Sequence, residues 1–299
     1  MRNFITIVLS ILSFFISVSA QTPKTGWEKN GLKGKVKEVR EYGMKKPGGI
    51  KKKGSLLNSR SFDAKGNKVE QCYYYDDSLD YKDVYKYDSN NNMIEECWYK
   101  ADGSLFHKGV FKYESNNLTE LYVYNSDSLK SKNILKYDEN NNKIEECLYK
   151  PDGSLICKRV YKYDSNNNKI EMYKQDFYDN GLELEHYINY IKYKYDSNNN
   201  MIEECWYMAD SSLSVKTTIK YDENNNKIEE ISCLHDGSLL SKSTFKYDSN
   251  NNVVEKAIYI SYGSLISKLL YKYDSHNNCI EIKDVTYGSG SIIEYEYYK

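Results

Sequence analysis

The sequence contains few of the residues that enzymes and helical proteins rely on. It has 3 prolines and 4 histidines in 299 residues, and no common spacing relates His107, His186, His235 and His276. No nucleophile elbow, phosphate-binding loop or metal-ligand spacing is present, so we expect no enzyme activity, no cofactor and no metal site. Helical periodicity is also missing after residue 21, which predicts a chain of strands and turns.

Long apolar runs occur only at the N-terminus. Arg2 precedes an apolar run over residues 4–18, and Val18-Ser19-Ala20 supplies small residues before Gln21. This layout is typical of a signal peptide and is too short for a bilayer span. We therefore expect residues 1–20 to be removed and the protein to be secreted, periplasmic or on the cell surface, without a membrane span.

Neither sign of charge dominates the chain. With 42 Lys and Arg against 43 Asp and Glu, the net charge is −1, which gives no reason to expect a nucleic-acid partner. Basic residues are dense only in residues 24–53. This segment is either a patch for anionic surface polymers or a solvated loop between two strand-like segments, residues 34–42 and 57–62.

One unit repeats over most of the chain. Each copy has an aromatic residue before an acidic turn, and we number positions from that residue as zero. The nine references are Phe62, Tyr87, Tyr113, Tyr137, Tyr163, Tyr195, Tyr221, Tyr247 and Tyr273, separated by 24 to 32 residues. A period of this size indicates a repeat architecture. We divide the chain into a signal peptide (1–20), an N-terminal strand with a basic loop (21–56) and a tandem hairpin domain (57–299).

The pattern within one copy predicts a β-hairpin. Apolar residues at −2 and zero share one face of a strand, and a lysine at −1 lies on the other. If zero pairs with +7, that lysine is opposite the glutamate at +8, as in Lys86 with Glu95 and Lys220 with Glu229. Glutamates of successive hairpins would be about 9.6 Å apart, which favours structural ion pairs over paired catalytic carboxylates. The Asp/Asn turn and the Asp-Gly turn both require a left-handed residue.

Nine such units give about eighteen strands, and the N-terminal pair adds two. A sheet of this size curls, so we predict an all-β fold, a long antiparallel meander of hairpins curling into a hollow spiral or open barrel. Strands of about seven or eight residues would fall short of the nine to eleven that a porin needs. The 32-residue step contains an insertion at residues 176–189 whose Asp179-Asn180-Gly181 indicates a longer hairpin.

The repeated Tyr-Asp-x-x-Gly/Asn-Asn with a downstream Asp-Gly resembles the bacterial RHS/YD-repeat proteins, over roughly residues 57 to 280. The resemblance implies curled antiparallel sheets, export or surface association, and either carbohydrate binding or enclosure of a toxin domain. The turn is one residue longer than in the family unit, and asparagine replaces glycine in most copies. The sequence shows neither the family's core-associated segment nor a cargo domain, so we expect a stand-alone exported repeat protein.

Two functional classes follow from this reading. In the first, the sheet binds cell-surface or extracellular carbohydrate or another polymer, with Trp98, Trp206, Tyr99 and Tyr207 as stacking residues. A core position for the tryptophans is the alternative, in which case their loss would lower stability. In the second class, the protein is a structural or self-associating scaffold whose terminal strand edges pair with other copies.

Seven cysteines are present, an odd number for an exported chain. Four of them, Cys72, Cys97, Cys147 and Cys205, share position +10 and are too far apart to pair. Cys147 and Cys157 flank the turn at residues 150–154 symmetrically. A bulge at Gly153 would bring these two opposite each other, so a disulfide between them is predicted for that register and free thiols for any other.

Overall fold

The structure is a computed structural model that describes residues 24–45, 52–179 and 184–299. The predicted signal peptide, the centre of the basic loop and the predicted turn at Asn180-Gly181 lie outside the described residues. Side chains of residues 178–189, which include His186, also lie outside them. Among the described residues, no helix has both the length and the apolar character needed to cross a bilayer.

Twenty antiparallel strands form one sheet, as the repeat count predicted. Their bounds are β1 (Val36–Lys45), β2 (Lys52–Phe62), β3 (Lys68–Tyr75), β4 (Ser78–Tyr87), β5 (Met93–Lys100), β6 (Leu105–Glu114), β7 (Asn117–Asn125), β8 (Ser128–Tyr137), β9 (Lys143–Tyr149), β10 (Leu155–Tyr163), β11 (Lys169–Asp179), β12 (Leu184–Tyr195), β13 (Met201–Tyr207), β14 (Leu213–Tyr221), β15 (Lys227–Leu234), β16 (Leu239–Tyr247), β17 (Val253–Ile260), β18 (Ser264–Tyr273), β19 (Cys279–Asp284) and β20 (Gly290–Tyr297). Within the described ranges, the helical elements are α2 (Gly26–Lys29) and the 3₁₀ turn η3 (Ser261–Gly263). Most strands exceed the predicted seven or eight residues, because hydrogen bonding continues up to the tight turns.

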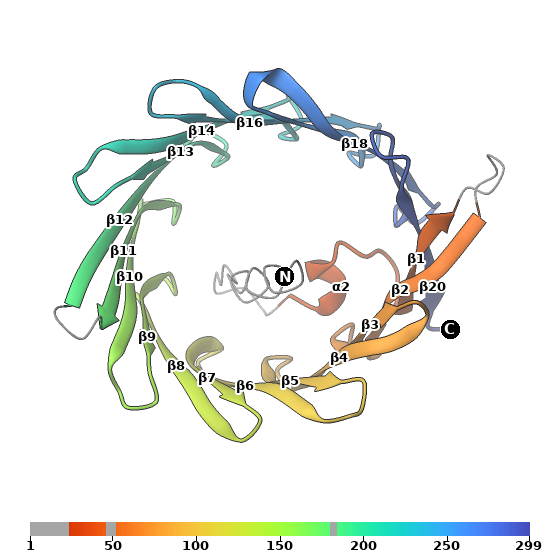
Figure 1. Ribbon diagram of the computed structural model, residues 1–299, viewed down its shortest axis with the longest axis horizontal. Coiled ribbons are helices and arrows are strands. Elements are labelled where there is room, and N and C mark those ends of the chain that lie inside the picture. The colour runs from red at the N-terminus through yellow and green to blue at the C-terminus, as the bar shows by residue number, and fades with distance from the viewer. Residues whose placement is uncertain (1–23, 46–51, 180–183) are drawn as a thin grey trace.

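The sheet closes into a barrel instead of remaining open. The N-terminal strand β1 pairs with β2 on one side and with β20 on the other, from Val36 opposite Tyr297 to Gly43 opposite Ser291. Figure 1 shows the resulting ring, with the first and last strands side by side. Closure satisfies the backbone groups that two free edges would have exposed. The N-terminal pair, which lies outside the repeat pattern, supplies the strand that completes the ring.

Helix α2 lies inside the ring and identifies the luminal face of the sheet (Figure 1). The indole N–H of Trp27 donates to the carbonyl of Val36 at 2.6 Å, and its ring packs on the cluster of Val39, Phe62 and Ile293. A Cβ added at Gly66, whose φ is +86°, would come within 2.5 Å of that ring. This contact explains why the first copy has glycine where later copies have asparagine.

A β-bulge in each hairpin sets the register. Tyr87 pairs with Met93 at +6, whereas Lys86 pairs with Glu95 at +8, so Ile94 at +7 is the extra residue. The predicted pairing of position zero with +7 is therefore wrong, but the pairing of lysine at −1 with glutamate at +8, which was inferred from it, is correct. The Tyr87 hydroxyl donates at 2.8 Å to the carbonyl of Lys68, the +6 residue of the preceding copy. Equivalent bonds from Tyr113, Tyr137, Tyr163, Tyr195, Tyr221, Tyr247 and Tyr273 repeat this contact around the barrel. The repeated tyrosine is thus a structural residue that bonds to a carbonyl beside the bulge.

Asparagines connect the turns at one end of the barrel, which we call the asparagine rim. The +5 residue Asn142 donates at 3.1 Å to Asp138 of its own turn and at 2.8 Å to the side chain of Asn167 in the next copy. Asn167 occupies the left-handed +4 position with φ of 62°. The same two bonds recur in most copies, for example from Asn226. The asparagine-rich turn thus joins neighbouring hairpins, a link that the pattern of a single copy did not reveal.

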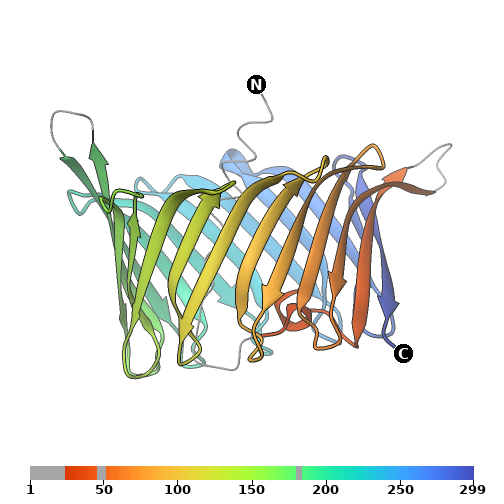
Figure 2. The ribbon, with the colours of Figure 1, turned by 90° about the horizontal axis from the view of Figure 1, so that it is seen from below.

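The Asp-Gly turns form the opposite rim. Gly103, Gly153 and Gly237 have φ between 80° and 87°, as the turn prediction required. Several large side chains on this rim are exposed, among them Tyr75 (80%), Tyr262 (102%) and Tyr287 (71%). The longest hairpin, β11 with β12, projects beyond the rim in Figure 2, which confirms that the insertion lengthens a hairpin.

Candidate functional site in the barrel lumen

The outer wall carries a repeated ion triad. Glu95 binds Lys86 and Lys108 at 2.6 Å each, and the two charged hydrogen bonds lower the pKa of Glu95 to about 2. Complete triads recur at Glu120, Glu145, Glu203, Glu229 and Glu255. The register prediction for Lys86 with Glu95 and Lys220 with Glu229 is therefore confirmed. Each triad is self-contained, which leaves the glutamate no free oxygen for chemistry.

Both predicted stacking tryptophans face the lumen. Trp98 pairs with Asp83 and His107, and Trp206 pairs with Ile191 and Val215, all on the luminal side of the sheet. Trp206 is 43% exposed, so the lumen is open to solvent at this point. Its indole N–H donates to Glu204. Trp98 is half-buried and contacts the His107 ring edge-on, with centroids 5.6 Å apart.

The predicted neighbours Tyr99 and Tyr207 lie on the other side of the wall. Successive residues of a strand point to opposite faces, so Tyr99 and Tyr207 face outward beside the ion triads. The four predicted residues therefore do not form one surface. The sequence signal that could have shown this is the alternation itself, because each tyrosine directly follows its tryptophan in the identical segments at residues 93–99 and 201–207.

Two buried carboxylates lie next to Trp98, and sequence reasoning missed them. Asp83 is 5% exposed and Glu96 is 6% exposed, on adjacent luminal strands. The Tyr85 hydroxyl donates to Asp83 Oδ2 at 3.3 Å, while Asp83 Oδ1 is buried with no hydrogen-bond partner within the described part of the chain. Burial raises the pKa of Asp83 to about 6, against the opposing effect of Lys68, and raises that of Glu96 to about 6. Burial therefore makes both carboxyl groups weaker acids than exposed carboxyl groups.

A third luminal carboxylate, Glu146, shows the opposite arrangement. It accepts a 3.0 Å bond from Lys143 and a 3.0 Å bond from the Tyr161 hydroxyl, and Arg159 lies 3.8 Å away. Burial alone would raise the pKa of Glu146, but Lys143 and Arg159 outweigh it and lower the pKa. Glu146 is a satisfied structural anion, whereas Lys68 acts on the Asp83 and Glu96 pair without offsetting the effect of burial on their pKa values.

The predicted disulfide is absent from the structure. Cys147 pairs with Lys158, and Cys157 pairs with Leu148, so the two cysteines differ by one register step and point to opposite faces. All seven cysteines are free, in residues the structure describes, including the ladder at +10. The turn bonds Lys150 to Ser154 as predicted, but a bulge between Leu155 and Cys157 shifts the partner.

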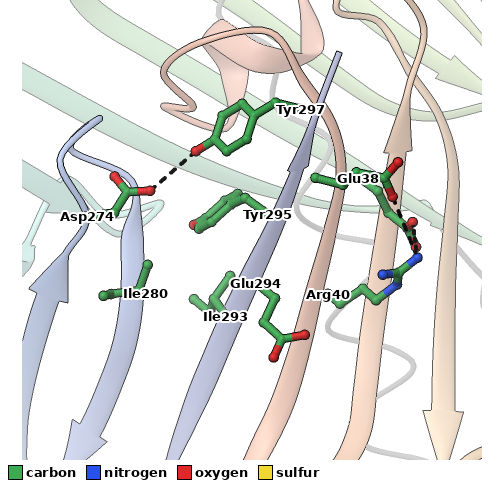
Figure 3. Close-up of a pocket in the computed structure, with 9 residues that line it drawn as sticks. Glu38, Arg40, Asp274, Ile280, Ile293, Glu294, Tyr295 and Tyr297 are labelled. Carbon is green, nitrogen blue, oxygen red and sulfur yellow. Dashed lines mark hydrogen bonds and ion pairs between the residues drawn. The ribbon is translucent and has the colours of Figure 1, made fainter. Parts of the chain in front are cut away.

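A cavity of about 440 Å³ lies beside β20, at the seam where the barrel closes. Figure 3 shows its lining, with Tyr297 directed at Asp274 and Arg40 directed at Glu38. Its other acids are engaged, because Glu294 binds Lys53 at 2.8 Å and Glu296 binds Lys37 at 2.7 Å. These ion pairs join β1 and β2 to β20. The seam cavity is therefore part of barrel closure, and the lumen beside Trp98 and Trp206 is the better candidate site.

Comparisons with known proteins add no family assignment. No family model matches the chain, and no curated protein matches it. Among solved structures, similar chains include the Tc holotoxin pore of Photorhabdus luminescens, with 9% identity and a TM-score of 0.26. The match includes 78% of this chain and 15% of the toxin chain. Two porin-like proteins are also similar. The match to the Bacteroides uniformis protein has 8% identity and a TM-score of 0.38 and includes 87% of this chain and 96% of that protein. The match to the Bacteroides vulgatus protein has 12% identity and a TM-score of 0.32 and includes 88% of this chain and 98% of that protein.

Proposed function

We propose that the protein is a non-enzymatic, exported barrel of the RHS/YD-repeat kind that binds extracellular or cell-surface carbohydrate in its lumen. The observation that supports this most directly is the luminal position of Trp98 and Trp206, each beside a glutamate at +9. An indole offers an apolar face for a sugar ring, and a carboxylate accepts hydrogen bonds from sugar hydroxyls. Trp206 is the better stacking platform because 43% of it is exposed.

The charged outer wall favours an exterior in contact with water. A membrane barrel presents lipid with an apolar band about 25 Å tall, and a lysine at its middle costs about 2–4 kcal/mol. Here each complete triad places two lysines and a glutamate within strands of 7 to 12 residues, such as Lys194, Glu203 and Lys216 on β12 to β14. We therefore propose that the barrel functions outside the cytoplasm without crossing a bilayer.

A glycan and cell-wall polymer screen on the purified protein tests the proposal. Trp206→Ala should weaken binding of a retained glycan by about tenfold without changing the melting temperature, because the side chain is half-exposed. Tyr207→Ala is the matched control on the outer wall and should have no effect. If no glycan is retained, or if both variants lose binding equally, the luminal carbohydrate site is wrong.

The scaffold alternative now depends on a different surface. Closure leaves no free terminal edges for other copies to pair with, so the predicted edge-to-edge route is excluded for β1 and β20. Exposed Tyr75, Tyr262 and Tyr287 on the opposite rim instead offer apolar area for rim-to-rim association. Sedimentation at increasing concentration should then show assembly that disappears when the three tyrosines are replaced by serine.

A further inference from the structure

The repeat provides an internal control for the buried pair Asp83 and Glu96. Glu96 and Glu146 occupy the same position, +9, in their copies, and each pairs directly with one residue on the following strand. For Glu146 that residue is Arg159, and for Glu96 it is Gly109. The two sites therefore have the same backbone frame with different side chains around the carboxylate.

Each of the neighbours that satisfies Glu146 is replaced around Glu96. At +6, Lys143 is replaced by Met93, and at −2 of the following copy Tyr161 is replaced by Phe111. The amide of Asn133, which donates to Glu146 at 3.4 Å, is replaced by the carboxylate of Asp83. Two cations and two neutral donors are thus lost from the site and a second anion is added, while Lys68, Tyr85 and Trp98 replace Leu118, Leu135 and Leu148 of the Glu146 site.

The groups gained at this site do not neutralise the pair. Lys68 is the cation of this site, but its ammonium lies 4.4 Å over the Tyr85 ring and donates to Gln71 at 2.7 Å. The other polar groups facing the carboxylates are the phenols of Tyr73 and Tyr85, the Trp98 indole and, beyond Trp98, His107. Both Asp83 Oδ1 and His107 Nδ1 are buried without a hydrogen-bond partner among the described residues. A buried anion pair of this kind calls for a cation.

We propose that the Asp83, Glu96 and Trp98 cluster binds the guanidinium or ammonium group of an organic cation from the lumen. Gly109 carries no side chain opposite Glu96, and the Phe111 ring lies 3.2 Å from the place that a Cβ would take there, so a ligand that occupies the position of Arg159 displaces this ring. A guanidinium there donates to both carboxylates, and the faces of Trp98 and Tyr73 stabilise a cation. This inference goes beyond the proposed carbohydrate site, because it concerns a charged ligand and does not involve Trp206.

Calorimetric titration of the full-length protein with butylguanidinium, and with its neutral isostere butylurea, tests the proposal. The protein should bind butylguanidinium and not butylurea. The Asp83→Asn/Glu96→Gln double variant, which keeps side-chain shape, should weaken binding by at least about tenfold. Glu204→Gln is the matched control. Glu204 lies beside Trp206 in an identical Met-Ile-Glu-Glu-Cys-Trp-Tyr segment, but position −4 of its copy is Ile191 instead of an aspartate. This variant should leave butylguanidinium binding unchanged.

Two further measurements make the result decisive. Binding should be at least about fivefold weaker at pH 5 than at pH 8, because protonation removes the anions. Gly109→Arg places an arginine where Arg159 lies in the other copy, and it should abolish butylguanidinium binding. Equal binding of both probes, no binding of either, or full binding by the double variant would each overturn the cation site. A glycan retained through Trp206 in any of these cases would leave the carbohydrate proposal intact.

Discussion

The outer and luminal walls of this barrel are built from the same strands but follow different rules. On the outside, six of the nine copies repeat the lysine, glutamate and lysine of the Lys86, Glu95 and Lys108 triad. On the inside, one position changes from hairpin to hairpin. Position +9 is Gln71, Glu96, Glu146, Met172, Glu204, Glu230, Lys256 and Ile282, and Leu121 takes this place in the copy whose turn is one residue shorter. Repetition on the outer wall fixes register, whereas the variable luminal wall is free to carry specific sites. Burial also differs, so the energies of similar ion pairs should differ between the walls.

The largest expected effect is on the inside. Arg159→Leu removes a cation whose side chain is 13% exposed and leaves Glu146 buried with one of its two cations, Lys143. Breaking a buried ion pair costs about 3–5 kcal/mol, and we expect about 3 kcal/mol here. Urea unfolding measures the loss. The Arg159→Leu/Glu146→Leu double variant should recover most of it, and a double variant as unstable as the single one would contradict a charge effect.

Glu96→Gln should raise stability at alkaline pH. The folded pKa of Glu96, about 6, lies above the unfolded value of about 4.3. Its carboxyl group is therefore best tolerated below pH 4.3, and stability falls as pH rises through 6. The variant should be more stable than the wild type by about 2 kcal/mol at pH 8 and equal to it at pH 4. Melting curves across this pH range measure the difference. Identical pH profiles for the variant and the wild type would show that the charged form of Glu96 does not destabilise the fold.

Asn142→Ala tests how much a buried contact of the repeated asparagine rim contributes to stability. Asn142 is 8% exposed, and its side-chain amide bonds Asp138 and Asn167. Its loss leaves both acceptors without that donor, at a cost of about 1–2 kcal/mol. Chemical denaturation provides the value. A neutral result would mean that water replaces the amide and that the asparagine rim does not hold the turns together.

The smallest effect should be on the outer wall. Lys108→Met removes one arm of the Glu95 triad, and exposed ion pairs contribute about 0.2–1 kcal/mol. The difference should shrink in high salt, because screening acts on exposed charges. Since the folded pKa of Glu95 is lowered to about 2, its contribution is present above pH 4.3 and is lost as pH falls through 2. A loss as large as that of Arg159→Leu would remove the distinction between the walls.

Much of the local structure could be predicted because it depends on neighbouring residues. Alternation placed Lys86 with Glu95, and glycine or asparagine marked the left-handed turns. The same alternation, applied to Trp98 and Tyr99, would have placed them on opposite faces. The carboxylate pair could not be recognised in the same way, because Asp83 and Glu96 belong to different strands and neither matches a known motif.

The sequence alone determined the number of strands, their antiparallel order and the face on which the repeated charges lie, because each of these follows from contacts within one copy. Tertiary structure decided the rest. Closure depended on β1 meeting β20, and the bulge at Ile94 depended on a carbonyl being bonded by a tyrosine of the next hairpin. Curling turned one face inward, and that geometry made Asp83 and Glu96 a buried pair while leaving the lysine and glutamate triads in solvent. Periodicity specifies a hairpin, but only the closed ring defines an inside.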